Sequence, residues 1–166
     1  MLLKNANIME KKVLTFKNSI KEMNGIIRAF DSAFMRKEEQ GWEKIYVLVD
    51  IHDTIFKACY ENEETYEAYP WALTTLRLMT QHKDICLILW TSTYPEKLDE
   101  YLKKFEEYRI SFDMINGNPE VPNTELSCFD HKPYFNVGID DRFGFNPEED
   151  WRSLWFYLVG IKEEEK

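Results

Sequence analysis

Short apolar runs that each stop at a polar residue constrain the fold of this chain more than any other feature. Apolar runs cover residues 45–49 and 85–90, and two further strand candidates with polar residues among them cover 111–115 and 135–139. Asp50, Thr91 and Asp140 directly follow the first, second and fourth of them. Continuous apolar runs of this length are typical of strands buried on both faces, as in a parallel sheet. The sequence therefore predicts four such strands, the one at 111–115 being the weakest.

Helical patterns alternate with these runs. Before the first run, apolar residues recur at spacings of three and four and mark one face of an amphipathic helix that Gly41 ends. These residues are Ile20, Met23, Ile26, Ile27, Phe30 and Phe34. Further helices are predicted to begin at Pro70 and at Pro95, and a closing helix is predicted over 151–158. Residues 116–133 are rich in Gly, Pro and Asn and predict a long loop near the edge of the sheet.

Alternation of strands and helices predicts an α/β fold, a three-layer Rossmann-like parallel sheet with helices on both faces. The chain has 166 residues, of which 44% are hydrophobic, which suits one domain. We expect an N-terminal helical extension over 1–41, the α/β domain over 42–160 and a charged C-terminal tail over 161–166. The segments between the strands leave no room for a separate cap domain.

Composition excludes several classes of protein. A net charge of -9 gives no support to nucleic acid as a partner. No segment has the apolar length of a membrane helix, and the N-terminus lacks the pattern of a secretory signal, so a cytoplasmic protein is expected. Three scattered cysteines with no C-x-x-C pair argue against a disulfide framework and against a cysteine-ligated zinc site.

Polar residues at the strand ends predict a functional site. Ligands of parallel sheets bind beyond the carboxyl ends of the strands, and Asp50, Thr91, Ser92, Asp140 and Asp141 all stand there. Carboxylates from two strands form a hard oxygen site suited to Mg²⁺, which keeps several waters and accepts substrate phosphate. The sequence thus predicts a magnesium site in which the metal lets a carboxylate approach a phosphate.

The motif V-L-V-D-I-H-D-T-I resembles the first motif of the haloacid dehalogenase (HAD) superfamily, an apolar strand followed by D-x-D-x-T. I-L-W-T resembles the second motif, and F-N-V-G-I-D-D the fourth. The resemblance implies that Asp50 attacks phosphorus, that His52 supplies a backbone carbonyl to Mg²⁺ and acts as acid and base, and that Thr91 donates to the phosphoryl oxygens. It also implies metal binding by Asp140 and Asp141.

The resemblance implies two further features, a lysine that neutralises the phosphate and a capless architecture. Lys132, shortly before the fourth strand, is the candidate for that lysine. Without a cap the site is open, which suits bulky phosphorylated substrates of unknown identity or cover by another subunit in a homo-oligomer.

His52 departs from the pattern, because most HAD phosphatases carry Asp there. Imidazole titrates near neutrality and can protonate a leaving oxygen, although a cation close to Mg²⁺ is disfavoured. Three readings stay open: a working hydrolase, a slow or altered enzyme, and a binding or regulatory protein that retains the metal site. A response-regulator receiver domain is a weaker alternative, since its paired acids stand near the N-terminus, whereas Asp140 and Asp141 come last.

Overall fold

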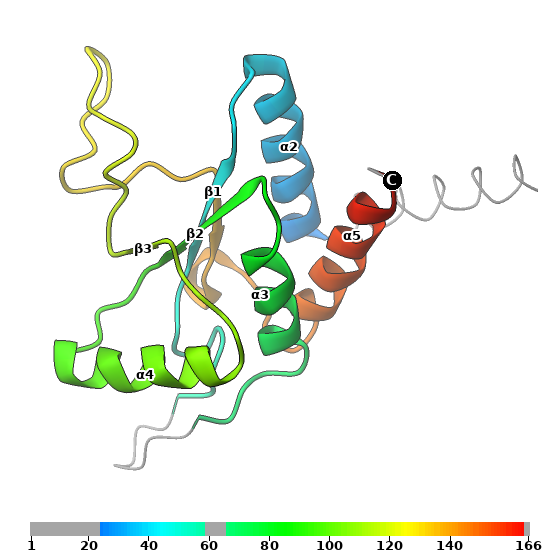
Figure 1. Ribbon diagram of the computed structural model, residues 1–166, viewed down its shortest axis with the longest axis vertical. Coiled ribbons are helices and arrows are strands. Elements are labelled where there is room, and N and C mark those ends of the chain that lie inside the picture. The colour runs from blue at the N-terminus through cyan, green and yellow to red at the C-terminus, as the bar shows by residue number, and fades with distance from the viewer. Residues whose placement is uncertain (1–23, 59–65, 165–166) are drawn as a thin grey trace, which may run out of the picture.

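A parallel sheet forms the centre of the molecule. The computed structural model describes residues 24–58 and 66–164, with side chains described as far as residue 160. Within these residues the sheet has four strands in the order β3-β2-β1-β4 (Figure 1). Their bounds are β1 Ile45–Val49, β2 Ile85–Leu89, β3 Met114–Ile115 and β4 Val137–Ile139. All three strand pairings are parallel, as the sequence predicted.

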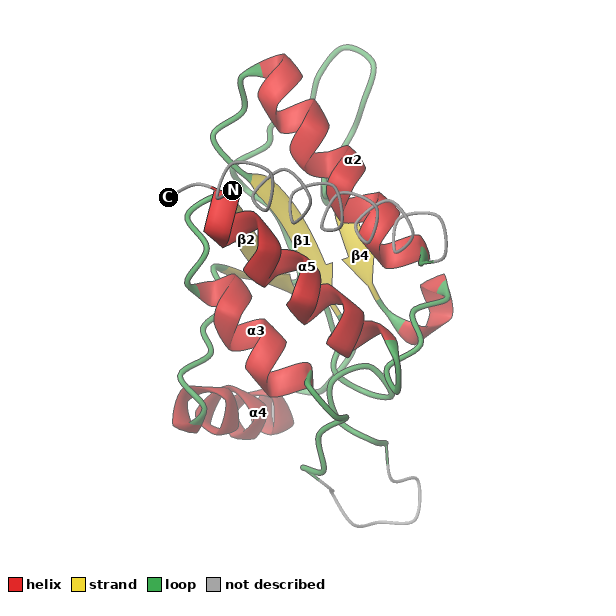
Figure 2. Ribbon diagram, turned by 90° about the vertical axis from the view of Figure 1, so that its right-hand side faces the viewer, coloured by secondary structure: helices red, strands yellow, loops and turns green. Residues whose placement is uncertain are grey.

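Helices surround this sheet. Their bounds are α2 Gly25–Gln40, α3 Ala72–Thr80, α4 Pro95–Glu107 and α5 Asp150–Glu164, with a short 3-10 helix, η1, at Asp141–Phe143. Helices α2, α3 and α5 lie together over one face of the sheet, and α4 lies behind it (Figure 2). The three-layer α/β fold expected from the sequence is therefore confirmed.

Helix α2 is part of the main core. The Asn24 side chain accepts hydrogen bonds from the backbone N–H groups of Ile26 and Ile27, which caps the helix start. Gly41 ends the helix with a φ of 66°, in the left-handed region that glycine adopts without strain. Ile26, Ile27 and Phe30 are buried in the same hydrophobic cluster as the strands. The predicted boundary at residue 41 therefore does not separate α2 from the α/β domain, because the helix and the sheet share one core.

Two strands are shorter than predicted because side chains take the place of backbone partners. The N–H of Leu87 donates to the Asp113 carboxylate at 2.7 Å, so β3 begins only at Met114 rather than at residue 111. The N–H of Tyr46 donates to Oδ1 of Asn136 at 2.8 Å, so β4 begins at Val137 rather than at residue 135. In each case a side-chain oxygen accepts the backbone N–H, so the N–H is satisfied without a longer strand.

Other predicted bounds shift slightly. Strand β2 ends at Leu89, one residue before the predicted end, and α3 begins at Ala72, two residues after Pro70. Helix α5 continues to Glu164, through the start of the tail predicted over 161–166. Residues 116–136 contain no helix or strand, as expected for the long loop. No helix within the described ranges has the length and apolar character needed to cross a membrane.

Candidate metal centre at the carboxyl edge of the sheet

Three carboxylates meet where β1 and β4 end. Asp50 follows β1, Asp140 follows β4, and Asp141 is the first residue of η1. One oxygen from each lies within 4.8 Å of the other two. The two strands are paired in parallel, and the N–H of Asp50 continues the ladder by donating to the carbonyl of Ile139 at 3.0 Å. Strand pairing thus brings together acids that are 90 positions apart in the sequence.

The hydroxyl of Thr54 joins two of these acids. Its Oγ1 donates to Oδ2 of Asp50 at 3.4 Å and accepts the N–H of Asp141 at 3.1 Å. Thr54 is fully buried, and its own carbonyl accepts the indole N–H of Trp151 on α5 at 2.8 Å. The sequence comparison with D-x-D-x-T included this threonine but gave it no role. The structure shows that Thr54 links Asp50 and Asp141 through one hydroxyl group.

The two acids after β4 have different environments. Asp140 is buried, and its carboxylate caps η1 by accepting the N–H of Arg142 at 2.8 Å. Asp141 is exposed. One carboxylate therefore faces the protein and shapes the turn, and the other faces solvent.

Burial and the repulsion between neighbouring carboxylates raise the pKa values of Asp50 and Asp141. Burial raises the pKa of Asp50 from its ordinary value of 3.8 to about 6, and the charges of Asp140 and Asp141 add to the effect. Hydrogen bonds from the backbone of Ile51 and from Thr54 oppose it. Burial, and then the neighbouring Asp140, also raise the pKa of Asp141. The cluster therefore holds more negative charge than its surroundings stabilise.

A hard divalent cation suits this donor set. Three carboxylates with oxygens this close repel one another, and a cation bound by oxygen ligands relieves that repulsion. No lysine or arginine is among the main groups that shift the pKa of Asp50. Asp50, Asp140 and Asp141, all predicted as metal ligands, are the residues that would hold the ion.

The side chain of His52, in the turn after β1, contacts Tyr101 of α4. Its Nε2 lies 2.9 Å from the hydroxyl of Tyr101, and the two rings meet edge to face with centroids 5.4 Å apart. Asp53 follows in a left-handed conformation with a φ of 53°, and its carboxylate accepts the N–H of Ala58 at 3.0 Å. This turn directs the chain back so that His52 bridges to Phe56. One ring nitrogen of His52 is thus engaged with a tyrosine of α4.

Thr91 stands at the end of the neighbouring strand. β1 and β2 pair in register from Ile45 to Val49, so Asp50 and Thr91 both leave the sheet at its carboxyl edge. Thr91 is buried, and its Oγ1 lies 2.7 Å from Oγ1 of Thr93. Ser92, the other hydroxyl predicted at this strand end, is exposed.

Asn116 fixes the backbone of Thr91 and was missed by the sequence reasoning. Its Oδ1 accepts the N–H of Thr91 at 2.7 Å, and its Nδ2 donates to the carbonyl of Thr91 at 2.8 Å. Asn116 has a φ of 51°, which asparagine tolerates better than most residues. The signal in the sequence is the Asn-Gly pair just after the predicted third strand, a pair that is also typical of an ordinary loop.

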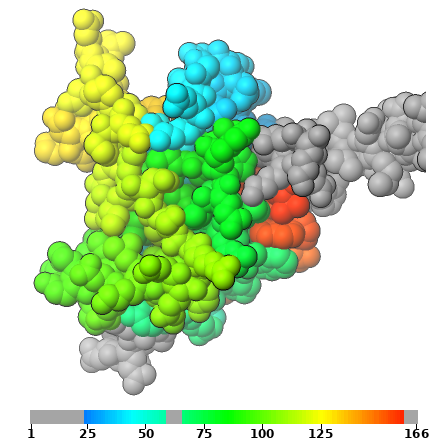
Figure 3. All heavy atoms as spheres, in the orientation of Figure 1, coloured from blue at the N-terminus to red at the C-terminus, as the bar shows by residue number. Residues whose placement is uncertain are grey.

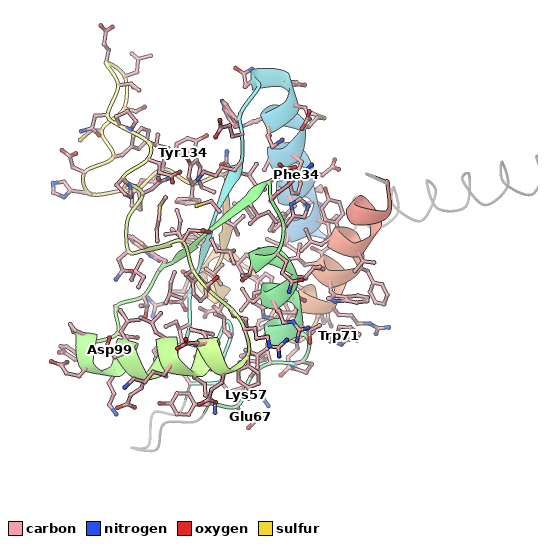
Figure 4. The ribbon with its side chains drawn as sticks, viewed as in Figure 1. Phe34, Lys57, Glu67, Trp71, Asp99 and Tyr134 are labelled. Atoms are coloured by element: carbon pink, nitrogen blue, oxygen red, sulfur yellow. The ribbon has the colours of Figure 1, made fainter. Side chains whose placement is uncertain are left out.

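Lys132 lies at the other end of the sheet. It is exposed and comes two residues before Tyr134, whose ring contacts Tyr46 near the amino end of β1 with centroids 6.0 Å apart. Asp50 follows the carboxyl end of the same strand, about 13 Å further along at the rise of an extended chain. Figure 4 shows Tyr134 far from the end of the sheet that α4 covers. The structure therefore does not bring Lys132 to the carboxylates, because β4 runs between it and Asp140.

Comparisons with known proteins bear on the fold. No family model and no curated protein matches the chain. A solved structure of a conserved protein from Bacteroides thetaiotaomicron is similar, with 27% sequence identity and a TM-score of 0.53. The match covers 74% of this chain and 93% of the other. It supports the α/β architecture and identifies no activity.

Fold and site together define a class of protein. The chain is an α/β protein with one parallel sheet and a cluster of three carboxylates at its carboxyl edge. Thr91 follows the neighbouring strand β2, two residues past its end at the same edge of the sheet.

Proposed function

We propose that this chain is a HAD-like, Mg²⁺-dependent phosphoester hydrolase that reacts through Asp50. The observation that carries the proposal is the cluster of Asp50, Asp140 and Asp141, with oxygens within 4.8 Å of one another at the carboxyl edge of a parallel sheet. This edge is where ligands of such sheets bind. These acids belong to the first and fourth sequence motifs.

Asp50 is suited to the part of nucleophile. It leaves the central strand β1 and is half-buried, and Thr54 fixes one of its oxygens. In the proposed reaction the other oxygen attacks phosphorus, the bond from phosphorus to the leaving oxygen breaks, and that oxygen takes a proton from His52. Water then gives a proton to His52 and attacks the aspartyl-phosphate, which releases phosphate and restores the carboxylate. Bound Mg²⁺ would neutralise the acids and polarise the phosphoryl group.

Thr91 and Ser92 are the proposed donors to the phosphoryl oxygens. The side chain of Asn116 binds both the backbone N–H and the backbone carbonyl of Thr91. The Thr91 hydroxyl therefore extends from a backbone segment that is held in place. Rigid positioning of donors is what makes them effective for a developing negative charge. The substrate is a phosphorylated molecule whose identity the site does not specify. Bulky phosphoesters fit the capless reading of the sequence, and a homo-oligomer remains the alternative way to cover the site.

A binding or regulatory protein that retains the metal site is the second candidate. Two observations favour it: His52 Nε2 is engaged with the Tyr101 hydroxyl, and Lys132 lies at the far end of the sheet. The hydrolase reading needs His52 as acid and base and Lys132 as the cation that neutralises the phosphate. Under this reading the protein binds Mg²⁺ and a phosphorylated ligand without turnover.

A broad phosphatase screen with Mg²⁺ separates the two candidates. We expect hydrolysis of at least one phosphoester class by the wild type, inhibition by vanadate or beryllium fluoride, and loss of nearly all activity in Asp50→Asn. Asp99→Asn is the matched control, because Asp99 is an exposed acid of α4, and it should keep full activity. Activity that survives in Asp50→Asn would remove the nucleophile assignment, and absence of any hydrolysis would leave the second candidate.

A further inference from the structure

A pocket of about 610 Å³ lies at the amino end of the sheet, on the opposite side from the carboxylates. Its aromatic walls come from two distant parts of the chain: Trp42 and Tyr46 around the start of β1, and Phe129 and Tyr134 from the loop before β4. Figure 3 shows part of that loop as an arm that projects beyond the body of the molecule. The volume falls within the range of sites for small molecules, roughly 300–1,000 Å³.

The aromatic rings form walls at right angles. Tyr134 meets Trp42, Tyr46 and Phe129 edge to face, at interplanar angles of 88°, 85° and 80°. Rings that stack in parallel would favour a flat ligand between them. Rings at right angles instead give the pocket several aromatic walls of different orientation, and clusters of aromatic rings are what binds quaternary ammonium groups.

Hydrogen bonds hold Tyr134 in place. Its carbonyl accepts the side-chain N–H of buried Asn118 at 2.9 Å, and its hydroxyl accepts the side-chain N–H of Asn136 at 3.1 Å. Asn136 is itself anchored to the backbone of Tyr46. The central ring of the pocket is therefore positioned by the protein and does not depend on a ligand, which lowers the entropic cost of binding.

The charges of the pocket favour a cation. Glu43, Glu120 and Lys44 line it, which leaves an excess of one negative charge. The ammonium group of Lys44 already makes the two kinds of contact that a cationic ligand would make. Its Nζ lies 2.7 Å from Glu120 and 5.7 Å from the centroid of the Tyr46 ring. Glu43 forms no ion pair with any described residue and so remains available to a second cation. The excess matches the negative charge of the chain, which disfavours anionic ligands such as nucleotides.

We propose that this pocket binds a small organic cation, an alkylated ammonium compound, which packs against the aromatic wall that Trp42 and Tyr134 form and pairs with the carboxylate of Glu43. The site is independent of the proposed phosphoester chemistry, since it lies at the other end of the sheet.

Choline is the probe, and 3,3-dimethyl-1-butanol is its neutral counterpart of nearly equal shape. We expect choline to shift the indole N–H resonance of Trp42 in a ¹H–¹⁵N spectrum of the full chain, and to bind at least about fivefold more tightly than the alcohol. Equal binding of the two compounds, or no shift with choline up to about 50 mM, would overturn the proposal.

Variants test the geometry in both directions. Trp42→Ala and Glu43→Gln should each weaken choline binding by about fivefold or more, whereas Trp71→Ala should not change it. Trp71 is the matched control, because it is exposed to 40% against 37% for Trp42 and lies outside the pocket. Lys44→Gln should strengthen binding about threefold, since it frees Glu120 and the Tyr46 ring for the ligand. Weaker binding in Lys44→Gln, or unchanged binding in Trp42→Ala, contradicts the assignment.

Discussion

The hydroxyl of Thr54 accepts the backbone N–H of Asp141 at 3.1 Å across 87 positions of sequence. Because the same oxygen donates to Asp50, it links the carboxylate that follows β1 with the turn that follows β4. The carbonyl of Thr54 accepts the indole N–H of Trp151, so α5 supports the arrangement from behind. Positioning of the acids therefore depends on a residue that is not itself charged.

Thr54→Val should destabilise the protein by about 1–2 kcal/mol and weaken its affinity for Mg²⁺. Valine has nearly the same shape but accepts no hydrogen bond, so the N–H of Asp141 loses its partner. Urea denaturation without metal measures the first effect, and calorimetric titration with Mg²⁺ measures the second. Thr74→Val, at an exposed position of α3, is the control and should change neither. Equal behaviour of the two variants would show that the bridge has no structural effect.

Mg²⁺ should raise the melting temperature by mass action, because the folded state alone presents the three carboxylates together. At a metal concentration one hundred times the Kd the added stability is about 2.7 kcal/mol. Asp141→Ala should abolish the rise, and Asp99→Ala should leave it intact, since Asp99 is an exposed acid of α4 outside the cluster. Differential scanning fluorimetry with and without EDTA provides the measurement. A rise that persists in both Asp50→Asn and Asp141→Ala would rule out the site.

Asp50 should lower the stability of the metal-free protein as the pH rises through about 4 to 6. Folding raises the pKa of Asp50 from 3.8 to about 6, so the unfolded chain releases this proton first. The stability contributed by protonated Asp50 is complete below pH 3.8 and is lost as the pH passes 6. Asp50→Asn should therefore melt above the wild type at pH 7.5 in EDTA, with a difference that shrinks toward pH 4. Asp99→Asn should show no such trend, and a constant offset for Asp50→Asn across this range would contradict the prediction.

Substitutions at His52 should distinguish the proposed hydrolase from the alternative, a binding or regulatory protein. If it works as acid and base, His52→Asn should lower the hydrolysis rate by roughly a hundredfold or more while Mg²⁺ binding stays nearly unchanged. If the enzyme is impaired by the histidine, His52→Asp should restore or increase turnover on simple phosphomonoesters. Tyr101→Phe removes only the hydroxyl that contacts His52 and keeps the ring that stacks on Phe56. No hydrolysis by the wild type or any of these variants, with normal Mg²⁺ binding, would exclude the hydrolase.

Phe30→Ala should destabilise the protein by about 3–5 kcal/mol, because Phe30 is fully buried where α2 joins the core and its loss leaves a cavity. Met35→Ala on the same helix is the control, since Met35 is 57% exposed. Thermal and urea denaturation give the comparison. A small effect of Phe30→Ala, similar to that of Met35→Ala, would show that α2 is a dispensable extension.

The sequence by itself determined the order and the kind of elements. The apolar run from Ile45 to Val49 is stable only at the centre of a sheet that is covered on both faces. Asp50 follows it directly, so the end of this strand can be predicted from neighbouring residues alone. The same local logic places Thr91 and Asp140 after their strands. These predictions succeed because periodicity and strand-end chemistry are properties of neighbouring residues.

Only the tertiary structure decided which of the candidate residues meet. Lys132 stands eight positions from Asp140, yet β4 carries the chain between them from the amino end of the parallel strands toward their carboxyl end. Thr54 and Asp141 are remote in sequence and bonded in space. The rings of Trp42 and Tyr134 meet for the same reason, since strand pairing juxtaposes the start of β1 with the loop before β4. The alternation of strands and helices predicted the parallel direction of the strands, but nearness across a sheet also depends on strand order, which the spacing of residues along the chain does not encode.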